Sequence, residues 1–119
     1  MNARVIMPTE IRRLIFENEE LADILSVFIS AEHTKTQPGR VLSCEVVKRD
    51  PITVRARIHF RSGHQDTEFF EEVFLCAAII SWCMRSKVPL ARKAKKSVRV
   101  TQDDRLALDV TLAAPTVPA

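Results

Sequence analysis

Glycine is scarce in this chain, with only Gly39 and Gly63 among 119 residues. Loops that wrap the phosphates of a nucleotide need closely spaced glycines, because only glycine lets the backbone turn sharply and approach the ligand. The two glycines here stand alone. The sequence therefore argues against nucleotide binding through a glycine-rich loop.

Clusters of cysteine and histidine that are typical of metal sites are also missing. Cys44, Cys76 and Cys83 form no Cys-x-x-Cys pair, and the three histidines form no His-x-x-x-His pair. We therefore expect no metal and no other cofactor. Cys76 and Cys83 would lie about 10 Å apart along one helix, which is too far for a disulfide. Buried thiols in a reducing compartment are the simpler interpretation, and we expect a cytoplasmic protein.

Long apolar segments are absent. The most apolar stretch, Val73 to Met84, is well short of the roughly 20 residues that span a bilayer. The first residues lack the apolar run of a signal peptide. We expect no association with a membrane.

Catalytic motifs are weak. Ser43, Ser62 and Ser97 have neither a nucleophile elbow nor a neighbouring histidine and acid. His64 precedes Asp66 by two residues, a spacing that a general base and its orienting acid could use, and Glu68 follows closely. The sequence favours a protein that is not an enzyme. A small enzyme that uses His64 with Asp66 or Glu68 is the second alternative.

The periodicity of apolar residues predicts one α+β domain over residues 1–112, followed by a flexible tail over 113–119. Either one bent helix or two consecutive helices, the second capped by Asn18, are expected from about residue 9 to 29. Another helix is expected over 69–86, and a hairpin should follow each of these two helical regions. In the first hairpin, Ile52, Val54, Ile58 and Phe60 should be buried. The predicted fold is a two-layer sandwich: a four-stranded, mostly antiparallel sheet of two hairpins with the helices packed on one face.

Cations are concentrated after residue 84. Such a run is typical of surfaces that bind nucleic acid or another polyanion, and the open sheet face should extend it. The predicted anion-binding residues are Arg92, Lys93, Lys95, Lys96, Arg99, Arg55, Arg57 and Arg61. No aromatic residue is interleaved with the run, so stacking on single strands is unsupported. The alternative is a solvated connector.

The predicted helix over 69–86 is apolar almost all the way round. Such a helix must be covered on every side, either within the domain or by a second chain. We expect self-association as a homodimer through Phe70, Phe74, Trp82 and Met84, most simply with two-fold symmetry. The alternative is a fully internal helix.

Together these patterns predict a small binding or regulatory module whose basic surface meets an anionic partner such as nucleic acid. The first alternative is a protein–protein interaction adaptor in which the basic run only keeps the protein soluble.

Overall fold

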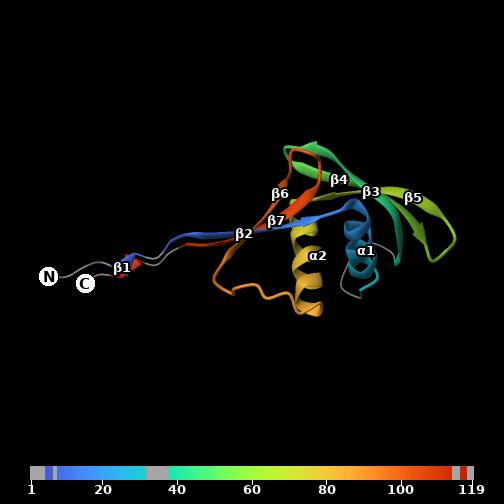
Figure 1. The fold of residues 1–119 in the computed structure, drawn as a ribbon. Helices are drawn as coiled ribbons and strands as arrows, with labels where there is room; N and C mark the ends of the chain where they lie inside the picture. Colours follow the sequence, from blue (N-terminus) through green and yellow to red (C-terminus); the bar gives the residue numbers. More distant parts are fainter. Residues whose placement is uncertain (1–4, 7, 32–37, 114–115, 118–119) are drawn as a thin grey trace.

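The computed structural model describes residues 5–6, 8–31, 38–113 and 116–117. Figure 1 shows the order of its elements. In chain order these are β1 (Val5–Ile6), β2 (Glu10–Phe16), α1 (Asn18–Ile29), β3 (Gly39–Arg49), β4 (Ile52–Phe60), β5 (Gln65–Glu71), α2 (Glu72–Arg85), β6 (Lys95–Val100), β7 (Leu106–Leu112) and β8 (Thr116–Val117).

Two separate three-stranded antiparallel sheets make up most of the fold. We call the β2–β7–β6 sheet the arm sheet and the β3–β4–β5 sheet the cap sheet. The prediction of a single four-stranded sheet is therefore wrong, although an α+β fold with antiparallel sheets is correct. Both predicted hairpins, β3–β4 and β6–β7, are present. Each hairpin forms a sheet of its own together with a third strand. That third strand, β2 or β5, comes from a segment that was expected to be helix or loop.

Strand β2 occupies residues that were expected to begin the first helix. Ile11, Leu14 and Ile15 fit a helical period, but this segment pairs with β7 along its whole length, from Glu10 opposite Leu112 to Phe16 opposite Leu106. This pairing outweighs the local pattern, as tertiary context often does for short amphipathic segments.

Helix α1 consequently begins only at Asn18. The cap is Glu17 rather than Asn18, and it forms a capping box with Glu20. The Glu17 backbone N–H donates a hydrogen bond of 2.9 Å to the Glu20 carboxylate. A capping box satisfies N–H groups that a helix start leaves without partners, so the new boundary is stable locally.

Strand β5 replaces the expected loop and first helical turn over residues 65–71. It pairs with β4 from His59 opposite Gln65 to Thr53 opposite Glu71. Helix α2 starts at Glu72 and ends at Arg85, before Pro89. At the C-terminal end of α2, the Val88 N–H donates a hydrogen bond of 2.8 Å to the Cys83 carbonyl.

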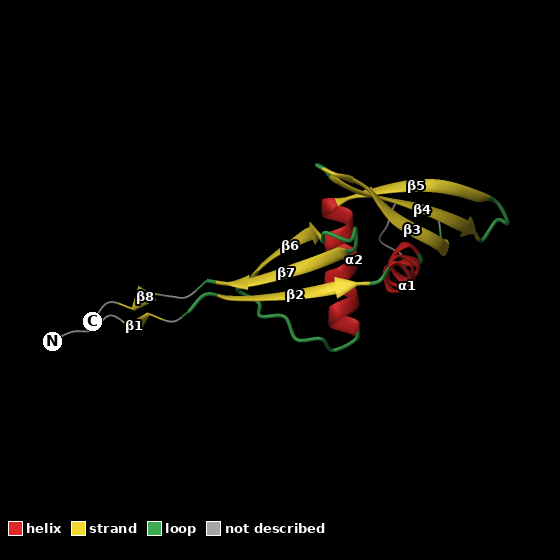
Figure 2. Cartoon of the chain, turned by 45° about the horizontal axis from the view of Figure 1, so that its top comes forward, coloured by secondary structure: helices red, strands yellow, loops and turns green. Residues whose placement is uncertain are grey.

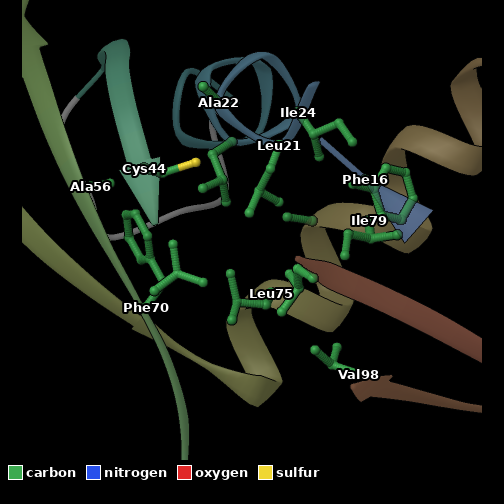
Figure 3. Close-up of a cluster of buried hydrophobic side chains, with 14 of the residues drawn as sticks. Phe16, Leu21, Ala22, Ile24, Cys44, Ala56, Phe70, Leu75, Ile79 and Val98 are labelled. Carbon is green, nitrogen blue, oxygen red and sulfur yellow. The ribbon is translucent and has the colours of Figure 1, made fainter. Parts of the chain in front are cut away.

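One core joins both sheets and both helices. Figure 3 shows side chains from α1, α2, β2, β6 and the cap sheet converging on the same space. Helix α1 packs on β3, helix α2 packs on β6 and β5, and the helices touch each other. Ile52, Val54, Ile58 and Phe60 are buried in this core, as predicted.

The arm sheet gives the molecule an elongated shape, with extents of 71 × 30 × 19 Å. Figures 1 and 2 show β2 and β7 running away from the helices toward the β1–β8 pair. Strand β8 lies within the segment predicted to be a flexible tail; residues 114, 115, 118 and 119 of that tail lie outside the described residues. None of the described helices is long and apolar enough to cross a membrane.

Candidate anion-binding surface

The two faces of the arm sheet have different chemistry. Leu106, Leu108 and Val110 of the central strand are buried against the core. On the other face, called here the outer face, the register aligns Arg13, Asp109 and Ser97 in one row across the three strands. Neighbouring rows on this face hold Ile15, Ala107 and Arg99, and Ile11, Thr111 and Lys95. Three cations thus share the outer face.

Asp109 lies between two of these cations. Arg13 donates two hydrogen bonds to it, from Nε to Oδ1 at 2.6 Å and from Nη2 to Oδ2 at 2.8 Å. The Arg99 Nε lies 3.8 Å from Oδ2. The hydrogen bonds from Arg13 lower the pKa of Asp109 below its usual value, although partial burial opposes them. A single carboxylate faces two guanidinium groups, so the outer face keeps a net positive charge.

The connector, residues 88–94, is fixed against the arm. The Arg12 Nη1 donates a hydrogen bond of 2.8 Å to the Pro89 carbonyl. The Lys96 ammonium donates to the carbonyls of Ala91 at 2.8 Å and Arg92 at 3.3 Å. These bonds position Arg92 and Lys93 directly before the cations of β6. They also mean that Lys96 has a structural role.

Cations dominate this part of the molecule. Strands β2, β6 and β7 with the connector contain seven cations and two acids, Glu10 and Asp109, in a chain whose net charge is +3. The remainder of the chain therefore has a net charge of −2. We call the seven cations the basic arm: Arg12, Arg13, Arg92, Lys93, Lys95, Lys96 and Arg99. Among the described residues, Arg92, Lys93, Lys95 and Lys96 have no acidic partner within ion-pairing distance.

A groove of about 450 Å³ lies between β2, β7 and the connector. Its lining is mostly apolar, and its two charged members, Glu10 and Arg12, have opposite signs. Arg92, Lys93, Lys95 and Lys96 are not part of this lining. The arm therefore presents charge on an exposed surface and not inside a pocket.

The structure separates the predicted anion-binding residues into two groups. Arg92, Lys93, Lys95, Lys96 and Arg99 belong to the arm. Arg55 and Arg57 lie on the exposed side of the cap sheet, so Arg99 does not continue their row. Arg55 is paired with Glu45, and Arg57 donates a hydrogen bond of 3.1 Å to the Gln65 side chain. Arg61 directly follows the end of β4.

Arg12 and Arg13 were missed by the sequence reasoning, because a helix was expected where β2 lies. The signal in the sequence was the pair of adjacent cations, Arg12 and Arg13, between Ile11 and Leu14. This pair becomes informative only once β2 is known to pair with β7.

The pair proposed for catalysis is open to solvent. His64 Nε2 lies 3.6 Å from Asp66 Oδ2, and both side chains are 60% exposed. Asp66 also accepts a hydrogen bond from the Thr67 N–H, and the His64 ring contacts Phe60 edge-on at 5.4 Å. Glu68 is half-buried on β5. His33 lies outside the described residues. An exposed pair of this kind gains little electrostatic strength, because water screens both groups.

The four residues predicted for self-association differ strongly in exposure. Phe70 is buried in the core, and the Phe74 ring stacks on it at 4.4 Å. Trp82 is half-buried and contacts Phe16 edge-on at 5.7 Å. Met84 is 73% exposed. Three of these side chains therefore contribute to the core, and Met84 remains on the surface.

The three cysteines are free thiols. Cys44 and Cys83 are buried, and the Cys44 thiol donates a hydrogen bond of 3.3 Å to the Asn18 carbonyl. Burial, with Glu19 and Glu45 nearby, raises the pKa of Cys44 to about 12. A thiol with such a pKa is a poor nucleophile at neutral pH. No three His, Cys, Asp or Glu side chains of the described residues gather as a metal site requires.

Comparisons with known proteins give no functional guide. No protein-family model matches the chain, and no curated protein or solved structure is significantly similar to it.

Proposed function

We propose that this chain is a non-enzymatic binding module whose basic arm binds the phosphate backbone of a nucleic-acid duplex. The observation that carries the proposal is the concentration of seven cations against two acids on one sheet and its connector, while the rest of the chain is net negative. Several closely spaced cations without interspersed acids are what phosphate neutralisation needs.

The chemistry of the arm favours a backbone contact over base recognition. Phe16 is the only aromatic residue in the arm and connector, and it is buried. Single-stranded nucleic acids are normally held by exposed aromatic rings that stack on bases, so a duplex fits this surface better. Contacts to phosphate carry no sequence information, and binding should therefore tolerate any sequence.

The adaptor alternative gives the same cations another purpose. Strand β6 is an edge strand of the arm sheet, and lysines on an edge strand prevent it from pairing with other chains. In this alternative Lys95 and Lys96 protect the edge, and the arm binds no nucleic acid at physiological salt.

The deciding experiment measures duplex binding by fluorescence anisotropy as a function of salt. The triple variant Arg92→Gln, Lys93→Gln and Lys95→Gln removes three charges and spares Lys96, which holds the connector. We expect weaker binding and a slope of log K against log salt that is reduced by up to about 0.9 for each lost contact. Folding should change little, because substitutions of exposed charges usually alter stability within about 0.5 kcal/mol.

The matched control is Arg55→Gln, Arg57→Gln and Arg61→Gln, which removes the same charge from the cap sheet. We expect a smaller loss of affinity for this variant. No binding of the wild-type protein at low salt would refute the proposal and favour the adaptor. An equal loss in both triple variants would show that overall charge, and not the arm, determines binding.

We further propose a cytoplasmic location and a homodimer. The free thiols of Cys44, Cys76 and Cys83 support a reducing compartment, where disulfides are rare. The support for a homodimer comes from the exposed surface of α2.

A further inference from the structure

Helix α2 has one face that the described part of the chain leaves uncovered. Val73 and Met84 are 87% and 73% exposed, Ala77 is exposed and Ile80 is half-buried. These four residues are spaced i, i+4, i+7 and i+11, so they lie along one side of the helix. We call them the open stripe. A helix in contact with water on this side would normally carry polar residues there.

We propose that the open stripe binds the open stripe of a second copy of this chain, with the two α2 helices antiparallel across a two-fold axis. This inference is independent of the proposed nucleic-acid binding. It also replaces Phe70, Phe74 and Trp82, which contribute to the core, by residues that the fold leaves available.

The stripe is complementary to itself in the antiparallel direction. If the axis passes between Ala78 and Ile79, Val73 lies level with Met84 of the partner subunit, and Ala77 lies level with Ile80 of the partner subunit. A two-fold interface uses the same patch on both copies, so each of these pairs occurs twice. Each pair places a smaller apolar side chain against a larger one, which allows close packing of the helices.

Charge at the helix ends selects this direction over a parallel one. Glu71 and Glu72 lie at the start of α2, and Arg85 and Lys87 lie at its end. Antiparallel helices bring the acidic end of one copy near the basic end of the other. Their helix dipoles then point in opposite directions, which is the favourable arrangement for two helices side by side. Parallel helices would bring like charges together at both ends.

The size of the stripe sets the strength expected. A helix of 14 residues is about 21 Å long, and one stripe along it buries less than the roughly 800 Å² per partner of a typical stable complex. We therefore expect a weak dimer that forms as the protein concentration rises into the micromolar range.

The test is sedimentation equilibrium without nucleic acid, over a range of protein concentrations. The wild-type protein should approach twice the 13.5 kDa mass of one chain. Val73→Glu and Met84→Lys should each remain monomeric, because each buries a charge against an apolar partner. The double variant should dimerise again, because the introduced carboxylate at position 73 then meets the introduced ammonium at position 84 of the partner subunit.

Val27→Glu is the matched control, because Val27 is an exposed apolar residue on α1 outside the open stripe. It should dimerise like the wild type. Circular dichroism checks that each variant is folded, and Val73→Ser with Met84→Ser replaces the charged variants if either unfolds. These serine variants should also dimerise more weakly.

Three results would overturn the inference. The first is a wild-type protein that is still monomeric at about 500 μM, well above the micromolar range expected for this dimer. The second is a Val73→Glu variant that dimerises like the wild type, and the third is a double variant that stays monomeric. The last result would exclude the antiparallel arrangement, since a parallel pair would place identical charges opposite each other.

Discussion

Arg13 and Asp109 form a two-pronged ion pair that joins β2 to β7 on the outer face of the arm sheet. The Asp109 side chain is only 11% exposed, whereas the Arg13 side chain is 46% exposed. The pair links strands that are far apart in sequence. It also neutralises one of the two arginines beside it and leaves Arg99 less well compensated at 3.8 Å.

The first prediction concerns Asp109→Asn, which keeps the shape of the side chain and removes its charge. We expect a loss of about 1–2 kcal/mol in the free energy of unfolding at pH 7, below the range for a fully buried charged pair because Arg13 is half exposed. Urea titration measures it. Asp103→Asn makes the same chemical change in an exposed turn and should cost less.

The pH dependence of stability provides the second prediction. Because Arg13 lowers the pKa of Asp109 in the folded protein, the stabilisation by this carboxylate is fully present above its unfolded value of about 3.9 and disappears as pH falls through the lower folded value. Wild type should therefore lose more stability than Asp109→Asn as pH falls below about 4. Parallel stability curves in this range would show that Asp109 has no lowered pKa.

The two sides of α2 allow a matched stability test. Leu75 is fully buried and Val73 is almost fully exposed, although they are two residues apart. Leu75→Ala should destabilise the fold by about 2–5 kcal/mol, because it opens a cavity in the core. Val73→Ala should stay within about 0.5 kcal/mol at concentrations where the chain is monomeric. Similar thermal melting temperatures for both variants would contradict the placement of α2.

Thiol reactivity gives the last prediction. At pH 8 the native protein should react slowly with iodoacetamide, because burial raises the pKa of all three thiols. Cys76 should react first, since it is the least buried and Lys96 partly offsets the shift in its pKa. Cys76→Ser should remove the fastest phase, and all three thiols should react alike in denaturant. Fast alkylation of Cys44 in the native state would disagree with its burial.

Local sequence patterns predicted those elements whose partners are close along the chain. The alternation in Ile52–Phe60 identified β4 and its buried side, because this hairpin depends on neighbouring residues. Strand β2 was mistaken for helix because Ile11, Leu14 and Ile15 fit the helical period and do not alternate as the residues of a strand with one buried side would. Its true state depends on β7, which lies at the other end of the sequence.

The candidate surface was predictable to a similar extent. The run from Arg92 to Arg99 is visible in sequence, but its union with Arg12 and Arg13 requires the arm sheet. The choice of Phe74 and Trp82 for self-association had the same weakness. A helix that is apolar on every side does not reveal which side the sheets cover, and the structure leaves Val73 and Met84 outside.

The pairing of β2 with β7 has a consequence for synthesis of the protein on the ribosome. The cap sheet consists of consecutive strands and can assemble once residue 71 has emerged. The arm sheet cannot, because β2 has no other strand partner among the described elements until Leu106–Leu112 has been made. During this interval Ile11 and Ile15 are carried on an unpaired strand, so we expect the nascent chain to be most prone to aggregation then. The large sequence separation of β2 and β7 also delays their pairing when the complete chain refolds. Pulsed hydrogen exchange during refolding should therefore show protection of β3–β5 before β2, and simultaneous protection would contradict this order.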